Sequence, residues 1–156
     1  MDHKIDYRWM RPEDGASLMR LHRRAILLEG VRAYGPDVAR SWAHDLRPEL
    51  YALATAEGEA IEVATIQGAV VGFCGVKDDE IRGLYVDPAY ARQGVGAELM
   101  RRALERIHAN GFERTRVTAA RSGVAFCEAM GFHTERGRMH PTRGGLAMPV
   151  LEMARP

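Results

Sequence analysis

The sequence predicts a mixed α/β fold, in which a sheet of six to seven strands is flanked by about four helices. Two observations predict it. Segments rich in β-branched and aromatic residues, joined by short turns, are interspersed with segments whose apolar residues recur every three to four positions. One long helical segment stands between two strand-like segments, and this order is typical of a sheet that combines hairpins with a helical crossover.

The N-terminal part is predicted to be one strand followed by helices. Alternating apolar residues predict the strand over Ile5–Met10. Apolar residues at helical spacing then predict a helix over Glu13–Leu28, with Gly30 as its stop signal. A second helix over Pro36–Asp45 and a short helical segment over Pro48–Ala56 follow.

The remaining part is predicted to hold most of the sheet. Gln67-Gly68 is a hairpin turn, and Asn110-Gly111 ends the longest helix in a left-handed conformation. We expect strands over Ile61–Ile66, Ala69–Val76, Glu80–Val86, Arg114–Ala119, Phe132–Arg138 and Leu146–Met153, and helices over Gly94–Ala109 and Ser122–Met130.

Length and composition limit the class of protein. The chain has 156 residues and a formal net charge of +1, from 22 Lys and Arg against 21 Asp and Glu. Because domains of roughly 100–200 residues are usual, we expect one domain over residues 1–156. No apolar stretch is long enough to span a bilayer, and the charged start, Met1–Arg11, lacks the apolar segment of a signal peptide. We therefore expect a cytoplasmic protein without a membrane partner.

The near-neutral charge argues against a nucleic acid as the main partner, because neutralising phosphates supplies most of the affinity for such partners. The distant Cys74 and Cys127 do not have the spacing of a metal site, and we predict no metal. Of the basic residues only Lys4 and Lys77 are lysines. Base composition of the genome, or arginines that bind phosphate or carboxylate, would each explain this bias.

Leu84–Leu99 is the segment that carries the chemistry. A strand ends at Asp-Pro, a tight loop holds one arginine and two glycines, and a long helix starts at once. A helix N-terminus offers free N–H groups to an anion, and Gly94 and Gly96 let a phosphate approach the backbone. Val95 stands where a Walker loop would have lysine, and Leu99 stands where a dinucleotide fingerprint would have a third small residue.

This segment resembles the cofactor motif of the GCN5-related N-acetyltransferases, the GNAT superfamily. A second segment, Phe126-Cys127-Glu128-Ala129-Met130-Gly131-Phe132, is similar to the family's Phe-Tyr-Glu-Lys-x-Gly-Phe. The order and length of the elements agree over residues 5–153, and the early helices resemble small bacterial members. The resemblance implies a twisted mixed sheet whose fourth and fifth strands splay apart to admit acetyl-CoA.

The resemblance also implies where acetyl-CoA, the co-substrate, binds. Backbone amides from Arg92 to Ala97 would hold the pyrophosphate, and Val86 would bind the pantetheine and steady the thioester oxygen. Ala91 stands where the family commonly has Gln or Arg, which should cost little because the backbone does most of the binding. The expected cofactor-binding residues are Leu84, Tyr85, Val86, Arg92, Gln93, Gly94, Val95, Gly96, Ala97, Ser122 and Phe126.

The implied activity is N-acetyl transfer, in which a small-molecule or peptide amine attacks the thioester within a ternary complex; family likeness also makes a homodimer a candidate assembly. Cys127 aligns with the tyrosine that many relatives use to protonate departing coenzyme A. It is either a weak proton donor, a small hydrophobic residue, or a reactive thiol. The missing tyrosine leaves an alternative open, a non-catalytic acyl-CoA-binding sensor.

The general base is the least defined part of the site. Relatives often place an acid where Arg82 stands, and Glu80, two residues earlier on the strand, would share its face. Glu80 is either the base or a solvated charge at a hairpin end. His22, on the polar side of the first helix, is the second candidate, and His44 and His133 are further ones.

Two regions are candidates for the acceptor pocket. Tyr34 and Trp42 lie between the first helices, where they would line a cavity or belong to the core. The late loop Met139–Leu146 is the other. Its basic side chains, which would suit an acidic acceptor or form a solvated surface, are Arg136, Arg138, His140 and Arg143.

Overall fold

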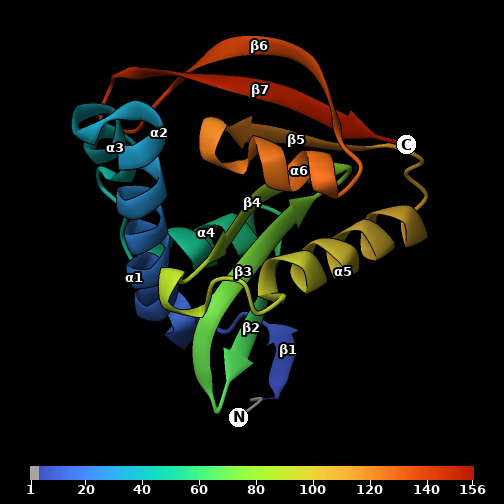
Figure 1. The fold of residues 1–156 in the computed structure, drawn as a ribbon. Coiled ribbons are helices and arrows are strands. Elements are labelled where there is room, and N and C mark those ends of the chain that lie inside the picture. Colours follow the sequence, from blue (N-terminus) through green and yellow to red (C-terminus); the bar gives the residue numbers. More distant parts are fainter. Residues whose placement is uncertain (1–3) are drawn as a thin grey trace.

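The computed structural model describes residues 4–156, so the first three residues of the charged N-terminal segment lie outside the described residues. Seven strands form one sheet in the order β1-β2-β3-β4-β5-β7-β6 (Figure 1). The strands are β1 (Ile5–Trp9), β2 (Ala60–Ile66), β3 (Ala69–Lys77), β4 (Glu80–Val86), β5 (Thr115–Ala120), β6 (His133–Pro141) and β7 (Ala147–Arg155). Among the described strands only the β4–β5 pair is parallel, so the sheet is mixed, as predicted.

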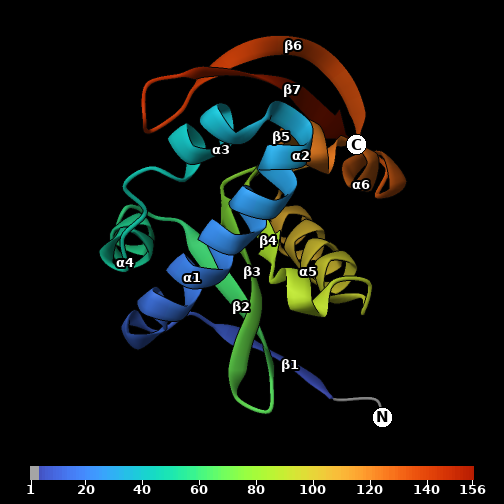
Figure 2. The same cartoon turned by 60° about the vertical axis from the view of Figure 1, so that its left-hand side comes forward.

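Helices cover both faces of the sheet. They are α1 (Gly15–Ala25), α2 (Val31–Tyr34), α3 (Pro36–Ala43), α4 (Glu49–Ala56), α5 (Val95–Ala109) and α6 (Val124–Ala129). Figure 2 shows α1 crossing the face of β2–β4 that lies opposite α5. Within residues 4–156, no helix is long and apolar enough to cross a bilayer.

Alternation along the strands divides the core between these two faces. On β2, Ile61 and Val63 pack with Leu18 and Leu21 of α1. Residues of the opposite parity join the larger cluster beneath α5, whose buried stripe is Val95, Leu99, Met100, Ala103 and Ile107. Leu104 of the same helix is only partly buried against this cluster.

Gly30 does not stop the first helix, and that prediction is wrong. Residues Ile26–Gly30 form a π-helical segment that leads directly into α2, and the left-handed residue is Gly35, with φ of 86°. A Cβ on Gly30 would lie 3.3 Å from atoms of Ala39 and Trp42. The glycine therefore allows close packing between helices. Such a contact between segments cannot be read from the local sequence, which is why the sequence predicts a helix end at Gly30.

The pairing of β4 with β5 ends after two residue pairs, Glu80↔Arg116 and Ile81↔Val117. A bulge against β3 falls at the same place, because Val76 pairs with Ile81 while Gly75 pairs with Gly83. A bulge bends its strand and breaks the alternation of side chains. The fourth and fifth strands consequently diverge, as the resemblance implied.

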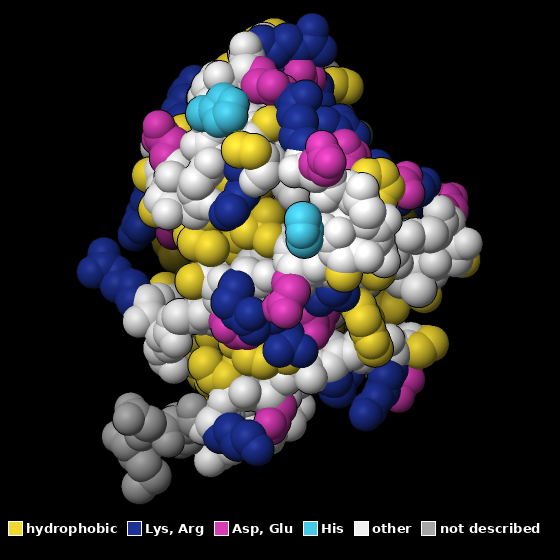
Figure 3. Space-filling model, turned by 90° about the vertical axis from the view of Figure 1, so that its right-hand side faces the viewer, with side chains coloured by type: hydrophobic (Ala, Val, Ile, Leu, Met, Phe, Trp, Pro, Cys, Tyr) yellow, Lys and Arg dark blue, Asp and Glu magenta, His cyan; other side chains and the backbone are white. Residues whose placement is uncertain are grey.

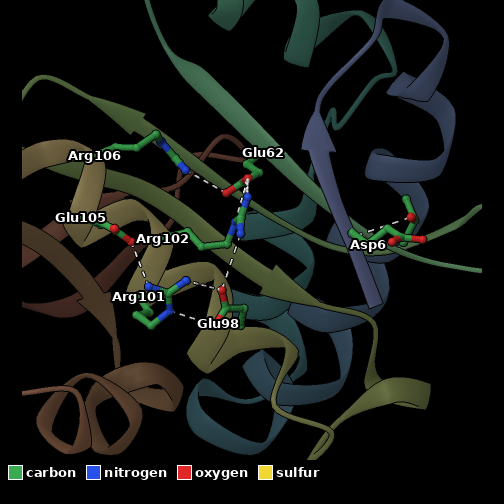
Figure 4. Close-up of polar contacts among 8 residues, drawn as sticks. Asp6, Glu62, Glu98, Arg101, Arg102, Glu105 and Arg106 are labelled. Atoms are coloured by element: carbon green, nitrogen blue, oxygen red, sulfur yellow. Dashed lines mark hydrogen bonds and ion pairs between the residues drawn. The ribbon is translucent and has the colours of Figure 1, made fainter. Parts of the chain in front are cut away.

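A buried carboxylate joins β2 to α5. Glu62, whose side chain is 5% exposed, receives hydrogen bonds from Arg102 at 2.9 Å and Arg106 at 2.8 Å (Figure 4). These guanidinium groups also stack on the rings of Tyr7 and Trp9 of β1, each 4.8 Å from the ring centroid.

On the face drawn in Figure 3, basic and acidic side chains are interspersed and form no continuous basic patch.

His22 makes the stability of this fold depend on pH. Its side chain is buried among Tyr51, Phe73 and Tyr85, and burial, with a smaller contribution from Arg143, lowers its pKa from 6.5 to about 3. The unfolded chain takes up a proton near pH 6.5, whereas the folded chain does not. The free energy of unfolding should therefore fall as the pH drops below 6.5, by up to about 1.4 kcal/mol per pH unit for this residue.

Chemical denaturation over a pH series checks this expectation. His22→Gln should flatten the dependence below pH 6.5, whatever its effect on the stability at higher pH. An unchanged slope in the variant would show that His22 is not the group responsible.

Candidate active site

A cavity of about 930 Å³ lies where β4 and β5 diverge. Its walls come from both sides of the gap and from the helices that flank it. On the β4 side Leu84, Tyr85 and Val86 line it, and on the β5 side Thr118 and Ala119 do. Every residue expected to bind the cofactor lines this cavity except Gln93.

The loop between β4 and α5 has the backbone of an anion-binding site. Arg92 and Gly94 both adopt left-handed conformations, with φ of 63° and 83°. No side chain caps the first turn of α5, and Gly94, Val95, Gly96 and Ala97 line the cavity. Free N–H groups and the positive end of the helix dipole therefore lie beside the cavity, where they can hold a phosphate.

Asp87 holds this loop in place. Its carboxylate accepts hydrogen bonds from the amide of Ala89 and from Arg24 of α1, each at 3.0 Å. Its own amide donates to the carbonyl of Val71 on β3 at 2.8 Å. The loop is thereby anchored to both the sheet and the first helix, so the helix N-terminus keeps a fixed position.

The absence of a side chain at Gly72 allows α5 to begin close to the sheet, whereas a Cβ on Gly96 would make ordinary contacts. A Cβ on Gly72 of β3 would lie 3.0 Å from Val95 and 3.1 Å from the carbonyl of Tyr85. At Gly96, atoms of Leu84, Val86 and Phe126 would lie 3.6–3.7 Å from a Cβ. The first turn of α5 therefore meets β4 and α6 at the gap. Gly72 was not predicted, because its reason lies in a contact between distant segments.

Cys127 lines the cavity from α6 and is 5% exposed. Burial raises the pKa of its thiol to about 11, so the group is protonated at neutral pH. Ser122 and Phe126 line the same wall. The structure therefore brings Cys127 to the gap, as a neutral thiol and not as a reactive thiolate.

His22 also lines the cavity, but it does not lie on a polar helix face, and that prediction is wrong. Its Nδ1 lies 3.0 Å from the hydroxyl of Tyr51, and its ring centroid lies 4.1 Å from that of Tyr85. Since its pKa is lowered to about 3, the imidazole is neutral and a poor proton acceptor.

The acidic candidate of the sequence, Glu80, is not part of the cavity wall. It pairs with Arg82 at 3.2 Å and Arg116 at 3.9 Å. The structure brings another carboxylate, Glu59, to the cavity. Burial raises the pKa of Glu59, against the opposing charges of Arg82 and Lys77.

Glu59 lies at the junction of α4 and β2, with its side chain packed over Gly75. Gly75 pairs directly with Gly83 on β4, so two adjacent strands lack side chains here. Within residues 4–156, Glu59 forms no ion pair. Sequence reasoning missed it because an acid between a helix and a strand carries no local signal of burial.

The aromatic candidates for the acceptor pocket separate into two positions. Trp42 lines the cavity, together with Leu46 and Leu50. Tyr34 does not line it; its hydroxyl donates to the carbonyl of Pro149 at 2.6 Å and accepts from the amide of Arg121 at 2.6 Å. Tyr34 therefore connects α2 to the C-terminal strands.

Within residues 4–156, no group of three or more His, Cys, Asp or Glu side chains is arranged to hold a metal ion. The site instead combines an anion-binding helix start, a neutral thiol, a half-buried carboxylate and aromatic walls. This set can bind a phosphate-containing molecule and accept a proton from a second reactant.

Known proteins with similar sequences and folds are acetyltransferases. Residues 30–148 match the family model of the acetyltransferase (GNAT) domain. The chain is 28% identical over 142 residues to "Uncharacterized N-acetyltransferase YafP" of Escherichia coli (strain K12), over 91% of this chain and 90% of that protein.

Solved structures have the same fold. A GCN5-related N-acetyltransferase from Rhodopseudomonas palustris superposes with a TM-score of 0.91 at 25% identity, over 99% of this chain and 98% of that one. The PaiA N-acetyltransferase from Thermoplasma acidophilum, in complex with coenzyme A, superposes with a TM-score of 0.76 at 20% identity, over 97% and 98% of the two chains. Because the family model covers more than half of its length, the chain belongs to the GNAT superfamily and is an N-acetyltransferase.

Proposed function

We propose that this protein transfers the acetyl group of acetyl-CoA directly to an acceptor amine within a ternary complex. The observation that carries the proposal is the gap between β4 and β5, which opens beside the N-terminus of α5 and is lined by both a thiol and a carboxylate. Binding both reactants in one cavity supplies much of the rate, because it replaces an encounter of separate molecules.

The residues present fit acetyl-CoA. The left-handed pair Arg92 and Gly94 and the first turn of α5 supply amides for the pyrophosphate. Beyond Ile81, the edge of β4 has no strand partner on the β5 side within residues 4–156, so its backbone groups are free to bind the pantetheine. Leu84, Val86 and Phe126 supply apolar contact.

The reaction requires a proton acceptor, because an acceptor amine is largely protonated at neutral pH and only its free form attacks. We assign this role to Glu59, the unpaired carboxylate in the cavity. As the amine nitrogen bonds to the acetyl carbon, the carbon–sulfur bond breaks and coenzyme A leaves as a thiolate. The proton that the ammonium form loses before the attack passes to Glu59, directly or through water. The second proton, which the nitrogen loses as the amide forms, passes to the departing thiolate or to solvent.

Cys127 does not need to protonate the leaving group. A proton transfer from a thiol of pKa about 11 to a thiolate of reference pKa about 8.5 is unfavourable. A thiolate of that pKa leaves readily near neutral pH. The role of Cys127 is therefore limited to donating a weak S–H hydrogen bond. His22 is neutral and hydrogen-bonded to Tyr51, so its role is limited to shaping the pocket.

The acceptor remains a small molecule or a peptide amine in this proposal. Coenzyme A release from acetyl-CoA over a library of amines tests the function. Acetyl-CoA binding without coenzyme A release from any amine would favour the sensor alternative. Three expectations stay predictions: that nucleic acid is not a partner, that the protein forms a homodimer, and that it is cytoplasmic.

Gly94→Asp should lower the affinity for coenzyme A by at least about ten-fold, because it sets a carboxylate beside the pyrophosphate. Gly68→Asp is the matched control: Gly68 also has φ of 83° and open space around it, but it lies in the β2–β3 turn, outside the cavity. Calorimetric titration of both variants checks the expectation. Equal affinities of Gly94→Asp and the unmodified protein would contradict the assigned phosphate site.

Glu59→Gln should lower kcat/KM by about 100-fold or more, the range of a lost general base. Since burial raises the pKa of Glu59, its ionisation should produce an acidic limb in the pH profile, with activity rising as the pH increases, and the variant should lack this limb. Glu80→Gln, which removes a neighbouring acid outside the cavity, should retain both. Loss of the limb in Glu80→Gln instead would transfer the role to that residue.

Cys127→Ala should keep kcat within about ten-fold of the unmodified enzyme and leave the basic side of its pH profile unchanged, because only a weak hydrogen bond is lost. Cys74→Ala is the control, since that thiol is also buried but lies outside the cavity wall. A far larger loss in Cys127→Ala, accompanied by loss of a basic limb, would identify Cys127 as the general acid.

A further inference from the structure

Residues 136–143 of the β6–β7 hairpin contain four basic side chains, and two of them share one carboxylate. Arg136 donates to the carboxylate of Glu152 at 2.5 Å, and Arg138 donates to it at 2.8 Å. Burial lowers the pKa of His140, with further contributions from Arg138 and Arg143, so this imidazole is uncharged at neutral pH. Among the three arginines of this group, Arg143 is the one that has no carboxylate partner within residues 4–156.

Arg143 lines the cavity at the loop that joins the two strands. Its Nη1 donates to the carbonyl of Trp42 at 3.1 Å. Within residues 4–156 it forms no ion pair with a carboxylate. The bond to Trp42 uses one N–H group and leaves further N–H groups of the guanidinium available to a ligand.

The loop that carries Arg143 is held in position by Ser41 of α3. The Ser41 and Thr142 hydroxyl oxygens lie 2.5 Å apart, and the Ser41 carbonyl accepts from the amide of Gly144 at 2.9 Å. A Cβ on Gly144 would lie 2.8 Å from the Cα of Ser41, so only glycine fits there. The backbone on both sides of Arg143 is consequently fixed before any ligand binds.

The positive charge of Arg143 acts on the aromatic floor of the cavity. It adds to burial in lowering the pKa of His22, and it opposes the rise in pKa that burial causes at Tyr51 and Tyr85. The guanidinium lines the same cavity as these rings, around which an acceptor would lie, and it is hydrogen-bonded to the carbonyl of Trp42.

Other charged groups that face the cavity do not compensate Arg143. Glu29 pairs with Arg32 of α2 at 3.6 Å, and Arg82 pairs with Glu80 at 3.2 Å. The positive charges that lower the pKa of Glu59 are those of Arg82 and Lys77. Most of the remaining acceptor-side wall is apolar or aromatic, with Ile26, Trp42, Leu46, Leu50 and Phe73.

We propose that the acceptor is an amine that also carries a carboxylate on an apolar body, and that Arg143 binds this carboxylate. A planar guanidinium can pair with a carboxylate through two parallel hydrogen bonds, which fixes the orientation of the ligand. The apolar body lies against the aromatic wall, and the amine faces the gap between β4 and β5. This inference rests on the proposed acetyl transfer, but its binding step can be measured without transfer.

Calorimetry on the full chain saturated with coenzyme A, which has no acetyl group to transfer, provides that measurement. Leucine, methionine and phenylalanine are compared with their amides, which keep the amine and side chain but lack the carboxylate. The acids should bind at least about ten-fold more tightly than the amides. Arg143→Gln should remove this preference, and Arg138→Gln, which changes a paired arginine of the same hairpin, should retain it.

Three outcomes would overturn the inference: amides that bind as tightly as the acids, an Arg143→Gln variant that keeps the preference, or no binding of any acid in the panel. Acetyl transfer is tested separately by coenzyme A release from acetyl-CoA. If the acids bind preferentially but release no coenzyme A, the carboxylate site is supported and the proposed function fails.

Discussion

The early end of pairing between β4 and β5 is the constraint on which the rest of the site depends. Two parallel pairs are followed by a bulge at Arg82, and beyond it the strands separate. Separation costs hydrogen bonds along one edge of β4, in the middle of a sheet where such edges are normally paired. The same separation creates the cavity and leaves backbone groups free for a ligand. A regular sheet would bury these groups and have no room for a cofactor.

Elements from opposite ends of the chain close the cavity around this gap. The start of α5 approaches the sheet because Gly72 has no side chain, and Asp87 joins the loop before it to α1. The π-helical segment Ile26–Gly30 contributes the opposite wall, a common position for such irregular turns. On the far side, Ser41 holds the β6–β7 loop. The cavity is therefore a product of tertiary packing, and its dimensions depend on contacts far apart in sequence.

Burial decides which of the titratable groups near the gap are suited to chemistry. A histidine and a thiol, residue types that often react, are both neutral here because the surroundings disfavour their charged forms. Glu59 keeps a raised pKa and no salt-bridge partner within residues 4–156, which suits proton transfer. Arg143 keeps its charge at another part of the cavity wall, beside Trp42. The proposed polarity of the acceptor, amine at one end and carboxylate at the other, follows from this division.

The sequence by itself determined the fold class, the order of the elements and the cofactor loop, because these depend on local periodicity, on glycines at a helix start and on two contiguous motifs. Side-chain partners were decided only by the tertiary structure. Glu80 and Arg82 follow simple alternation in the sequence, yet the bulge breaks it, and the carboxylate in the cavity comes from Glu59 on another segment. His22 has a polar side chain in a helix, yet three aromatic rings bury it. Such roles depend on what lies across the gap in space, which local patterns do not encode.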